Sequence, residues 1–125
     1  MEKKQIYRCA ICGNVVEVLH VGGGELVCCG QPMLTEVEKQ TDEGNEKHLP
    51  VVTVNGNVVN VKVGSVPHPM IEEHFIQWIE CVVGENVYKK ELKPNEVAEA
   101  IFTVEGDTSN MQVRAYCNVH GLWKA

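Results

Sequence analysis

Short apolar runs rich in valine and isoleucine, separated by polar turns, fill the chain from about residue 50 onward. These runs cover residues 51–54, 58–63, 75–83, 87–92, 100–104 and 111–117. β-Branched side chains at this spacing are typical of strands. Asn55-Gly56 between the first two runs is a strong signal for a hairpin, and helical periodicity is weak throughout. The pattern predicts an all-β fold, with an immunoglobulin-like β-sandwich in this part of the chain.

The first 37 residues follow another pattern. They carry four cysteines, a Gly22-Gly23-Gly24 turn and few large apolar side chains. A segment this short needs a metal, disulfides or a partner to fold. Residues 38–47 (EKQTDEGNEK) are polar apart from one glycine and read as a linker or exposed connection. We therefore predict a small metal-binding domain at 1–37 and a β-sandwich domain at 38–125.

Charge and hydropathy narrow the range of functions. Among 125 residues, 11 Lys+Arg stand against 17 Asp+Glu, for a formal net charge of −6. An acidic chain is a poor partner for nucleic acid. No run approaches the roughly 20 apolar residues of a membrane span, and the N-terminal residues lack the apolar stretch of a secretion signal. We expect a soluble cytoplasmic protein with neither a nucleic-acid nor a membrane partner.

Six cysteines are unusual for that compartment, where thiols more often bind metal than form disulfides. Cys9 and Cys12 form a CxxC knuckle followed by glycine, and Cys28 and Cys29 are adjacent and also followed by glycine. Four sulfur ligands in a distorted tetrahedron suit zinc or iron, and the spacing does not choose between them. A structural zinc knuckle is the simplest interpretation of the local motif, and a pair of disulfides is a weaker one.

A second group of candidate ligands lies beside predicted turns and strand ends. It consists of His48, His68, His74, Cys117 and His120. Taken singly, each histidine is more typical of a surface or hydrogen-bonded residue, but Cys117 and His120 have the spacing of metal ligands. Four imidazoles and one thiolate exceed a closed zinc site, which takes four ligands. Five ligands on iron would leave one octahedral position open.

These motifs carry a resemblance to a known family. Residues 6–37, with CxxCG followed by CCG, resemble desulforedoxin. Three further motifs resemble the catalytic domain of superoxide reductase and neelaredoxin: Glu46-Lys47-His48-Leu49-Pro50, His68-Pro69 with His74, and Cys117-Asn118-Val119-His120-Gly121. Over essentially its full length the chain is similar to the desulfoferrodoxin family, the two-iron superoxide reductases.

The resemblance implies two iron ions per chain. Cys9, Cys12, Cys28 and Cys29 would hold one, with zinc as a possible substitute, and the second group would hold the other, with its four histidines equatorial and Cys117 axial. The implied reaction is one-electron reduction of superoxide to hydrogen peroxide without release of oxygen. Lys47 would attract superoxide and deliver a proton, and Glu46 would be a mobile carboxylate at the open position. A rubredoxin-like electron donor and a homodimer are also implied.

Three alternatives remain at this stage. The protein could be a rubredoxin-type electron carrier without catalysis, an immunoglobulin-like binding module with a zinc knuckle, or a superoxide dismutase. Outside these sites, His20 is expected at the surface and Cys81 as a buried free thiol. Trp78 and Trp123 are expected to pack in the core.

Overall fold

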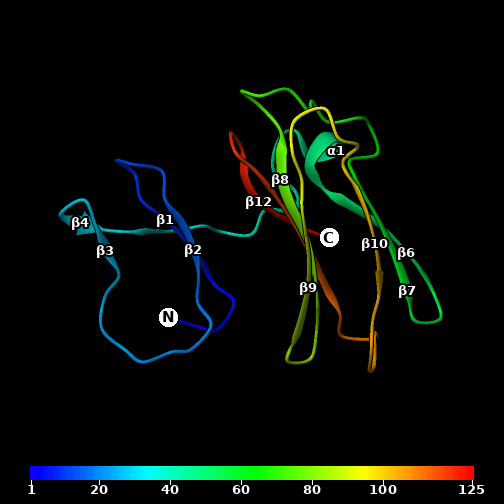
Figure 1. The fold of residues 1–125 in the computed structure, drawn as a ribbon, viewed down its shortest axis with the longest axis horizontal. Helices are drawn as coiled ribbons and strands as arrows, with labels where there is room; N and C mark the ends of the chain where they lie inside the picture. Colours follow the sequence, from blue (N-terminus) through cyan, green and yellow to red (C-terminus); the bar gives the residue numbers. More distant parts are fainter. The chain divides into compact units, whose positions relative to one another are not determined.

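The computed structural model describes residues Met1–Ala125 and consists of two compact units, Met1–Val37 and Glu38–Ala125 (Figure 1). Strands form nearly all of its regular structure, and the single helix, α1 (Asn45–His48), is one turn long. The predicted all-β fold is confirmed. No helix is long and apolar enough to cross a membrane.

The N-terminal unit is built from short antiparallel hairpins. Its strands are β1 (Ile6–Arg8), β2 (Val15–Glu17), β3 (Val27–Cys28), β4 (Gln31–Pro32) and β5 (Leu34–Thr35). One sheet has the order β2-β1-β5, and β3 pairs with β4. Each hairpin carries one cysteine pair: Cys9 and Cys12 follow β1, while Cys28 ends β3 and Cys29 lies in the turn after it.

The hydrophobic interior of this unit is very small. Only Ile6, Cys9 and Val18 are buried among its apolar residues, whereas Ile11, Leu19 and several others are exposed. Burial of a few side chains offsets little of the conformational entropy of 37 residues. A metal bound by the four cysteines would supply the crosslink that the hydrophobic contacts cannot.

The second unit is a sandwich of two antiparallel sheets. One contains β6 (Pro50–Asn55), β7 (Val58–Val63) and β10 (Glu99–Thr103) in the order β10-β7-β6. The other contains β8 (Ile76–Val83), β9 (Asn86–Glu91), β11 (Gln112–Cys117) and β12 (Gly121–Lys124) in the order β12-β11-β8-β9. The predicted hairpin forms, with Asn55 pairing with Val58 and Gly56 at a φ of 62°.

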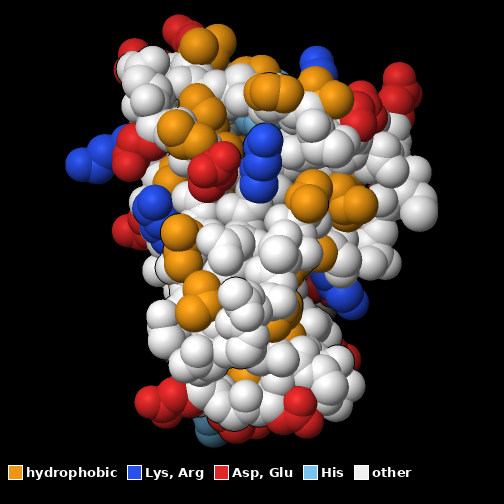
Figure 2. All heavy atoms as spheres, turned by 90° about the vertical axis from the view of Figure 1, so that its right-hand side faces the viewer, with side chains coloured by type: hydrophobic (Ala, Val, Ile, Leu, Met, Phe, Trp, Pro, Cys, Tyr) orange, Lys and Arg blue, Asp and Glu red, His pale blue; other side chains and the backbone are white.

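Figure 2 looks onto the side where β6, β7 and β10 lie. Hydrophobic side chains form small separate patches there among polar atoms and scattered acidic and basic groups. Val51, Val54 and Ile101 are exposed on these strands. This face therefore presents no extended basic surface, in line with the net charge of −6.

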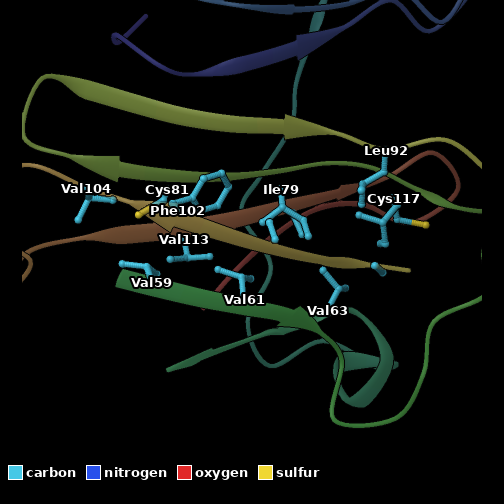
Figure 3. Packing of buried hydrophobic residues seen from close by; sticks show 14 of the residues in the cluster. Val59, Val61, Val63, Ile79, Cys81, Leu92, Phe102, Val104, Val113 and Cys117 are labelled. Carbon is cyan, nitrogen blue, oxygen red and sulfur yellow. The ribbon is translucent and has the colours of Figure 1, made fainter. Parts of the chain in front are cut away.

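The core lies between the two sheets, and its residues alternate along each strand as a half-buried sheet requires. Val59, Val61 and Val63 of β7 point toward the side chains of β8 and β11 (Figure 3). Ile79 and Cys81 of β8 are fully buried opposite them. Cys81 is a free thiol in this core, and burial raises its pKa.

The opposite face of the four-stranded sheet holds charged and aromatic groups. Glu80 is fully buried and accepts a hydrogen bond from Arg114 Nε at 2.7 Å, and Arg114 Nη1 lies 3.3 Å from Glu38. Trp78 is only half-buried and stacks on Tyr116 at a centroid distance of 4.4 Å. The prediction that Trp78 packs in the core is wrong, because Trp78 and the core residue Ile79 are adjacent and point to opposite faces.

The segment predicted as a linker is partly structured. Lys39 forms a parallel bridge with Trp123, since its N–H donates to the Leu122 carbonyl and its carbonyl accepts from the Lys124 N–H, both at 3.0 Å. Residues Asn45–His48 form α1, after Gly44 at a φ of 87°. Most of residues 38–47 are exposed, as expected of a connection, but Lys39 pairs with β12 and the end of the segment forms a helical turn.

Candidate metal centres

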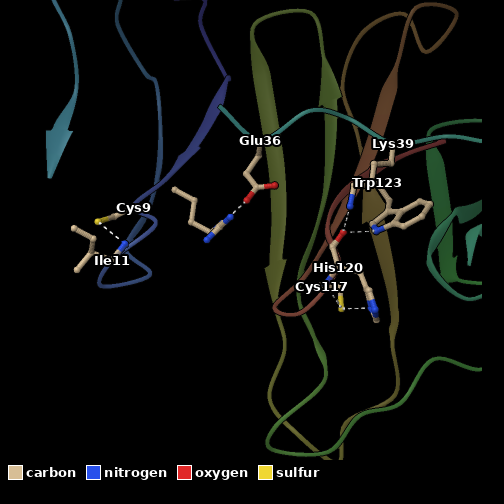
Figure 4. Close-up of polar contacts among 8 residues, drawn as sticks. Cys9, Ile11, Glu36, Lys39, Cys117, His120 and Trp123 are labelled. Atoms are coloured by element: carbon tan, nitrogen blue, oxygen red, sulfur yellow. Dashed lines mark hydrogen bonds and ion pairs between the residues drawn. The ribbon is translucent and has the colours of Figure 1, made fainter. Parts of the chain in front are cut away.

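The loop after β1 presents the first cysteine pair. The Gly13 N–H donates to the Cys9 carbonyl at 3.0 Å, and Gly13 has a φ of 79°, which favours glycine. The N–H groups of Ile11 and Cys12 both point at Cys9 Sγ from 3.4 Å (Figure 4 shows the contact with Ile11). Hydrogen bonds from these amides, that of Cys12 above all, lower the pKa of Cys9 to about 6. The loop thus favours a thiolate at Cys9.

The second cysteine pair, Cys28 and Cys29, lies at a tight turn whose backbone is left-handed at two successive residues. Cys29 and Gly30 have φ values of 53° and 77°. Cys28 Sγ lies 3.6 Å from Cys12 Sγ and 4.0 Å from Cys29 Sγ. All four sulfur atoms lie within 4.8 Å of one another. A tetrahedral ion with metal–sulfur bonds of 2.3 Å separates its sulfur atoms by about 3.8 Å, so the four cysteines fit such an ion.

Crowding of four sulfur atoms has an electrostatic cost. Interactions with Cys12 and Cys9 raise the pKa of Cys29 to about 12. The four thiols therefore do not all ionise together without a cation between them.

Four imidazole rings form the second centre. The ring centroids lie at the corners of a quadrilateral, and adjacent centroids are 4.6 to 4.9 Å apart. The order around it is His48, His68, His74 and His120. Adjacent rings are steeply tilted, at 60° to 83°. His48 and His74 face each other across the diagonal at 6.3 Å. The four ligand nitrogens and Cys117 Sγ all lie within 4.8 Å of one another.

Hydrogen bonds orient two of these rings toward the centre. His48 Nδ1 lies 2.8 Å from the Gly44 carbonyl, and His68 Nδ1 lies 2.6 Å from the Pro69 carbonyl. A ring that donates through Nδ1 keeps the lone pair of Nε2 for a metal. The Nε2 atoms of His48, His68 and His74 are buried and have no hydrogen-bond partner. Such orphaned nitrogens converge here because a metal ion is their expected partner.

Burial keeps these imidazoles neutral. It lowers the pKa of His48 and His74, and lowers that of His68 to about 4. Neutral imidazole is the form that binds metal. His48, His68 and His74 therefore have the form that a metal needs at neutral pH.

The fourth ring and the thiol come from the end of β11 and the turn that follows it. His120 Nδ1 lies 3.8 Å from Cys117 Sγ, and the His120 N–H points at the same sulfur from 3.4 Å. Burial raises the pKa of Cys117, which is fully buried, while the amides of His120 and Val119 oppose the rise. Tyr116 and Cys117 flank a register shift in the pairing with β8. This irregularity lets both the thiol and the imidazole face the centre.

Asn118 links this turn to the loop that carries His74. Its Oδ1 accepts from the Phe75 N–H at 3.0 Å, and its Nδ2 donates to the Glu73 carbonyl at 3.1 Å. Ile71 and His74 also pair through two backbone hydrogen bonds of 3.1 Å. Asn118 stood inside a recognised motif without a role, and the structure shows that it fixes one ligand loop against another.

Glu46 and Lys47 are exposed on α1, next to His48. Their backbone is held by the loop after β7, since the Val66 N–H donates to the Glu46 carbonyl at 2.9 Å. A Cβ built on Gly64 would lie 2.6 Å from the Lys47 carbonyl oxygen and 2.4 Å from that of Val66. Gly64 also has a φ of 81°, so this close approach needs glycine. His20, by contrast, is exposed in the other unit and joins neither centre.

The low pKa of His68 predicts how stability of the metal-free sandwich depends on pH. Between the unfolded value of 6.5 and the folded value of about 4, the unfolded chain binds more protons, so the free energy of unfolding falls as pH falls. His68 alone contributes roughly 1 kcal/mol per pH unit in this window. Urea unfolding at pH 7 and pH 5 measures it through tryptophan fluorescence, because both tryptophans belong to this unit. A His68→Gln variant should show a smaller pH dependence, and an equal one would contradict the assignment.

Comparison with known proteins places the chain in a family. Residues 40–125 match the desulfoferrodoxin family, and residues 1–35 match the desulfoferrodoxin N-terminal domain. The desulfoferrodoxin homolog of Archaeoglobus fulgidus is 55% identical over 99% of this chain and 98% of its own. The superoxide reductase of Pyrococcus horikoshii is 31% identical over 74% of this chain and 95% of its own.

Solved structures agree with this result. The superoxide reductase of Treponema pallidum superposes with a TM-score of 0.74 at 27% identity, covering 100% of this chain and 99% of that one. The four-cysteine group and the group of four histidines and one cysteine fit two iron sites. The predicted resemblance is confirmed: this chain belongs to the desulfoferrodoxin family.

Proposed function

We infer that the protein is a superoxide reductase, which transfers one electron to superoxide and, with two protons, yields hydrogen peroxide without oxygen. The observation that carries this inference is the convergence of four imidazoles and one thiol on one point of the sandwich. His48, His68, His74 and His120 would hold iron together with Cys117. Bound there, iron would supply the electron that superoxide accepts.

The burial of the donors indicates which side of this centre is open. Cys117, His48 and His68 are buried, whereas His74 is half-buried and His120 is exposed. Five protein donors also leave one position of an octahedron for a small anion. The rubredoxin-type carrier is less well supported, because an electron carrier needs no such open position.

Lys47 and Glu46 flank this centre and are our candidates for acting on the substrate. The positive charge of Lys47 acts on His74, whose pKa is lowered by burial first and by charges including that of Lys47. A cation at the centre's edge raises the local concentration of an anionic substrate in an acidic protein and can donate a proton to the developing peroxide. The exposed carboxylate of Glu46 would cover the open position and move aside for superoxide.

Replacement of Lys47 tests its role. In Lys47→Ala we expect the second-order rate with superoxide to fall about tenfold and to depend less on ionic strength, because electrostatic steering of the anion is lost. Pulse radiolysis at several salt concentrations measures both quantities. Lys90→Ala removes a positive charge from the exposed strand β9 and serves as the control. An unchanged rate and salt slope in Lys47→Ala would remove Lys47 from the mechanism.

The N-terminal unit is proposed to hold a second iron that relays electrons or crosslinks its short strands. Cys12 and Cys29 are exposed, which gives an electron donor of rubredoxin type access to that centre.

A homodimer is also proposed. Ile11 and Val27 are 62% and 57% exposed and would be buried against a second copy, whereas Ile6 is already buried within the chain. Six free cysteines favour a reducing compartment such as the cytoplasm.

Stoichiometry separates the reductase from a dismutase. A reductase forms one peroxide per superoxide, consumes one donor electron and releases no oxygen. A dismutase forms one peroxide and one oxygen from two superoxide ions and consumes no donor electrons. Simultaneous measurement of donor oxidation, peroxide and oxygen under a superoxide flux decides between them, and oxygen release without donor oxidation would overturn the reductase.

A further inference from the structure

The carbonyl oxygen of His120 is held by two donors from outside the predicted motifs. Lys39 Nζ donates to it at 2.7 Å and Trp123 Nε1 at 3.2 Å, as Figure 4 shows. The Trp123 ring stacks on His48 at a centroid distance of 4.7 Å and an interplanar angle of 15°. Lys39 Nζ lies 5.5 Å from the centroid of the same indole ring. Lys39 and Trp123 therefore contact two ligand residues without being ligands.

Hydrogen bonds and an ion pair hold the backbone at Lys39 and at both of its neighbours. This anchoring keeps the Lys39 ammonium group close to the His120 carbonyl. Both backbone hydrogen bonds of Lys39 go to β12. The preceding residue, Glu38, forms an ion pair with the buried Arg114 at 3.3 Å. The following residue, Gln40, donates through Nε2 to the Ala125 carbonyl at 3.3 Å. A long lysine side chain with such an anchor loses less entropy on making its hydrogen bond than a free surface lysine.

We propose that Lys39 is a positioning residue, which holds the Cys117–His120 turn through the His120 carbonyl and brings a positive charge to that turn, raising the reduction potential of the metal bound there. The turn is compact, because His120 contacts Cys117 Sγ both through its N–H at 3.4 Å and through Nδ1 at 3.8 Å. A positive charge close to the ligands favours the reduced state of the metal, because the reduced metal carries one positive charge fewer.

The proposal rests on the proposed iron site, and three variants separate the charge from the hydrogen bond. Lys39→Arg keeps both, Lys39→Gln keeps a donor without the charge, and Lys39→Met keeps neither. Lys90→Gln is the control, because it makes the same change in net charge on exposed β9. The readout is the midpoint potential of the second iron, followed by its visible spectrum in a redox titration of the iron-loaded protein.

We expect Lys39→Gln and Lys39→Met to lower the ratio of reduced to oxidised iron at fixed potential by about threefold to tenfold, or about 28 to 59 mV for one electron. Lys39→Arg and Lys90→Gln should keep the wild-type potential. Lys39→Met should in addition lose iron from this site faster to a chelator than Lys39→Gln. Wild-type potentials in both Lys39→Gln and Lys39→Met would overturn the proposal, as would an equal shift in Lys90→Gln. Failure of the iron site itself would instead appear as absence of the redox transition in the wild-type protein.

Discussion

Replacement of Cys117 by serine should abolish superoxide reduction while leaving the four-cysteine centre intact. The thiol is fully buried at the end of β11, and with metal bound its sulfur would be the one anionic donor beside four imidazoles. Loss of groups that only orient metal ligands typically costs 10- to 100-fold in affinity or activity, so loss of a ligand should cost about 100-fold or more. Reaction with a superoxide flux, together with the visible spectrum of each centre, measures the outcome.

Cys29→Ser is the matched variant in the other centre. It removes one of four sulfur donors and should disturb the spectrum of the N-terminal iron. Because the unit Glu38–Ala125 contains all five donors of the second centre, much of the superoxide reduction should remain. Equal loss of activity in Cys117→Ser and Cys29→Ser would contradict this division of labour.

Gly64→Ala should be among the most damaging substitutions that touch no ligand. A side chain at a φ of 81° costs about 1 to 2 kcal/mol in itself. A Cβ 2.4 Å from the Val66 carbonyl oxygen and 2.6 Å from that of Lys47 must also push backbone apart, which adds roughly 1 to 3 kcal/mol. Displacement of Lys47 shifts His48, so we expect lower stability in urea and weaker iron binding at the second centre.

Gly56→Ala provides the control for backbone strain alone. Gly56 also has a left-handed φ, of 62°, but a Cβ there would meet nothing within 4 Å. We expect it to lose only about 1 to 2 kcal/mol and to keep its iron. Equal destabilisation and equal iron content in the two variants would show that the contact between Gly64 and Lys47 has no part in shaping the centre.

The strands and the ligand groups could be predicted because each leaves a local signal. Valine-rich runs and the Asn55-Gly56 turn mark β6 and β7, and the spacing of Cys9 and Cys12 marks a metal knuckle. The convergence of His48, His68 and His74 was harder to foresee. These residues are distant along the chain. Their positions beside predicted turns and strand ends made them candidate ligands, and the resemblance to a family assigned them to one centre.

Other features could not be predicted because they depend on tertiary contacts. The one-turn helix α1 is too short for a periodic pattern, and β12 follows the ligand turn with few apolar residues. Lys39 looked like a linker residue, since nothing in its neighbourhood indicates pairing with Trp123. Trp78 was expected in the core, but alternation along β8 directs it to the opposite face.

The most direct test of the central claim is to measure the metals and their reactivity in one sample of protein purified without added zinc. We predict two irons per chain, of which one is rapidly reoxidised by superoxide and changes its spectrum with cyanide or azide. Peroxide should accumulate without oxygen. One iron or none, with a histidine centre that responds to neither superoxide nor these anions, would contradict the account and favour an electron carrier or a zinc-binding module.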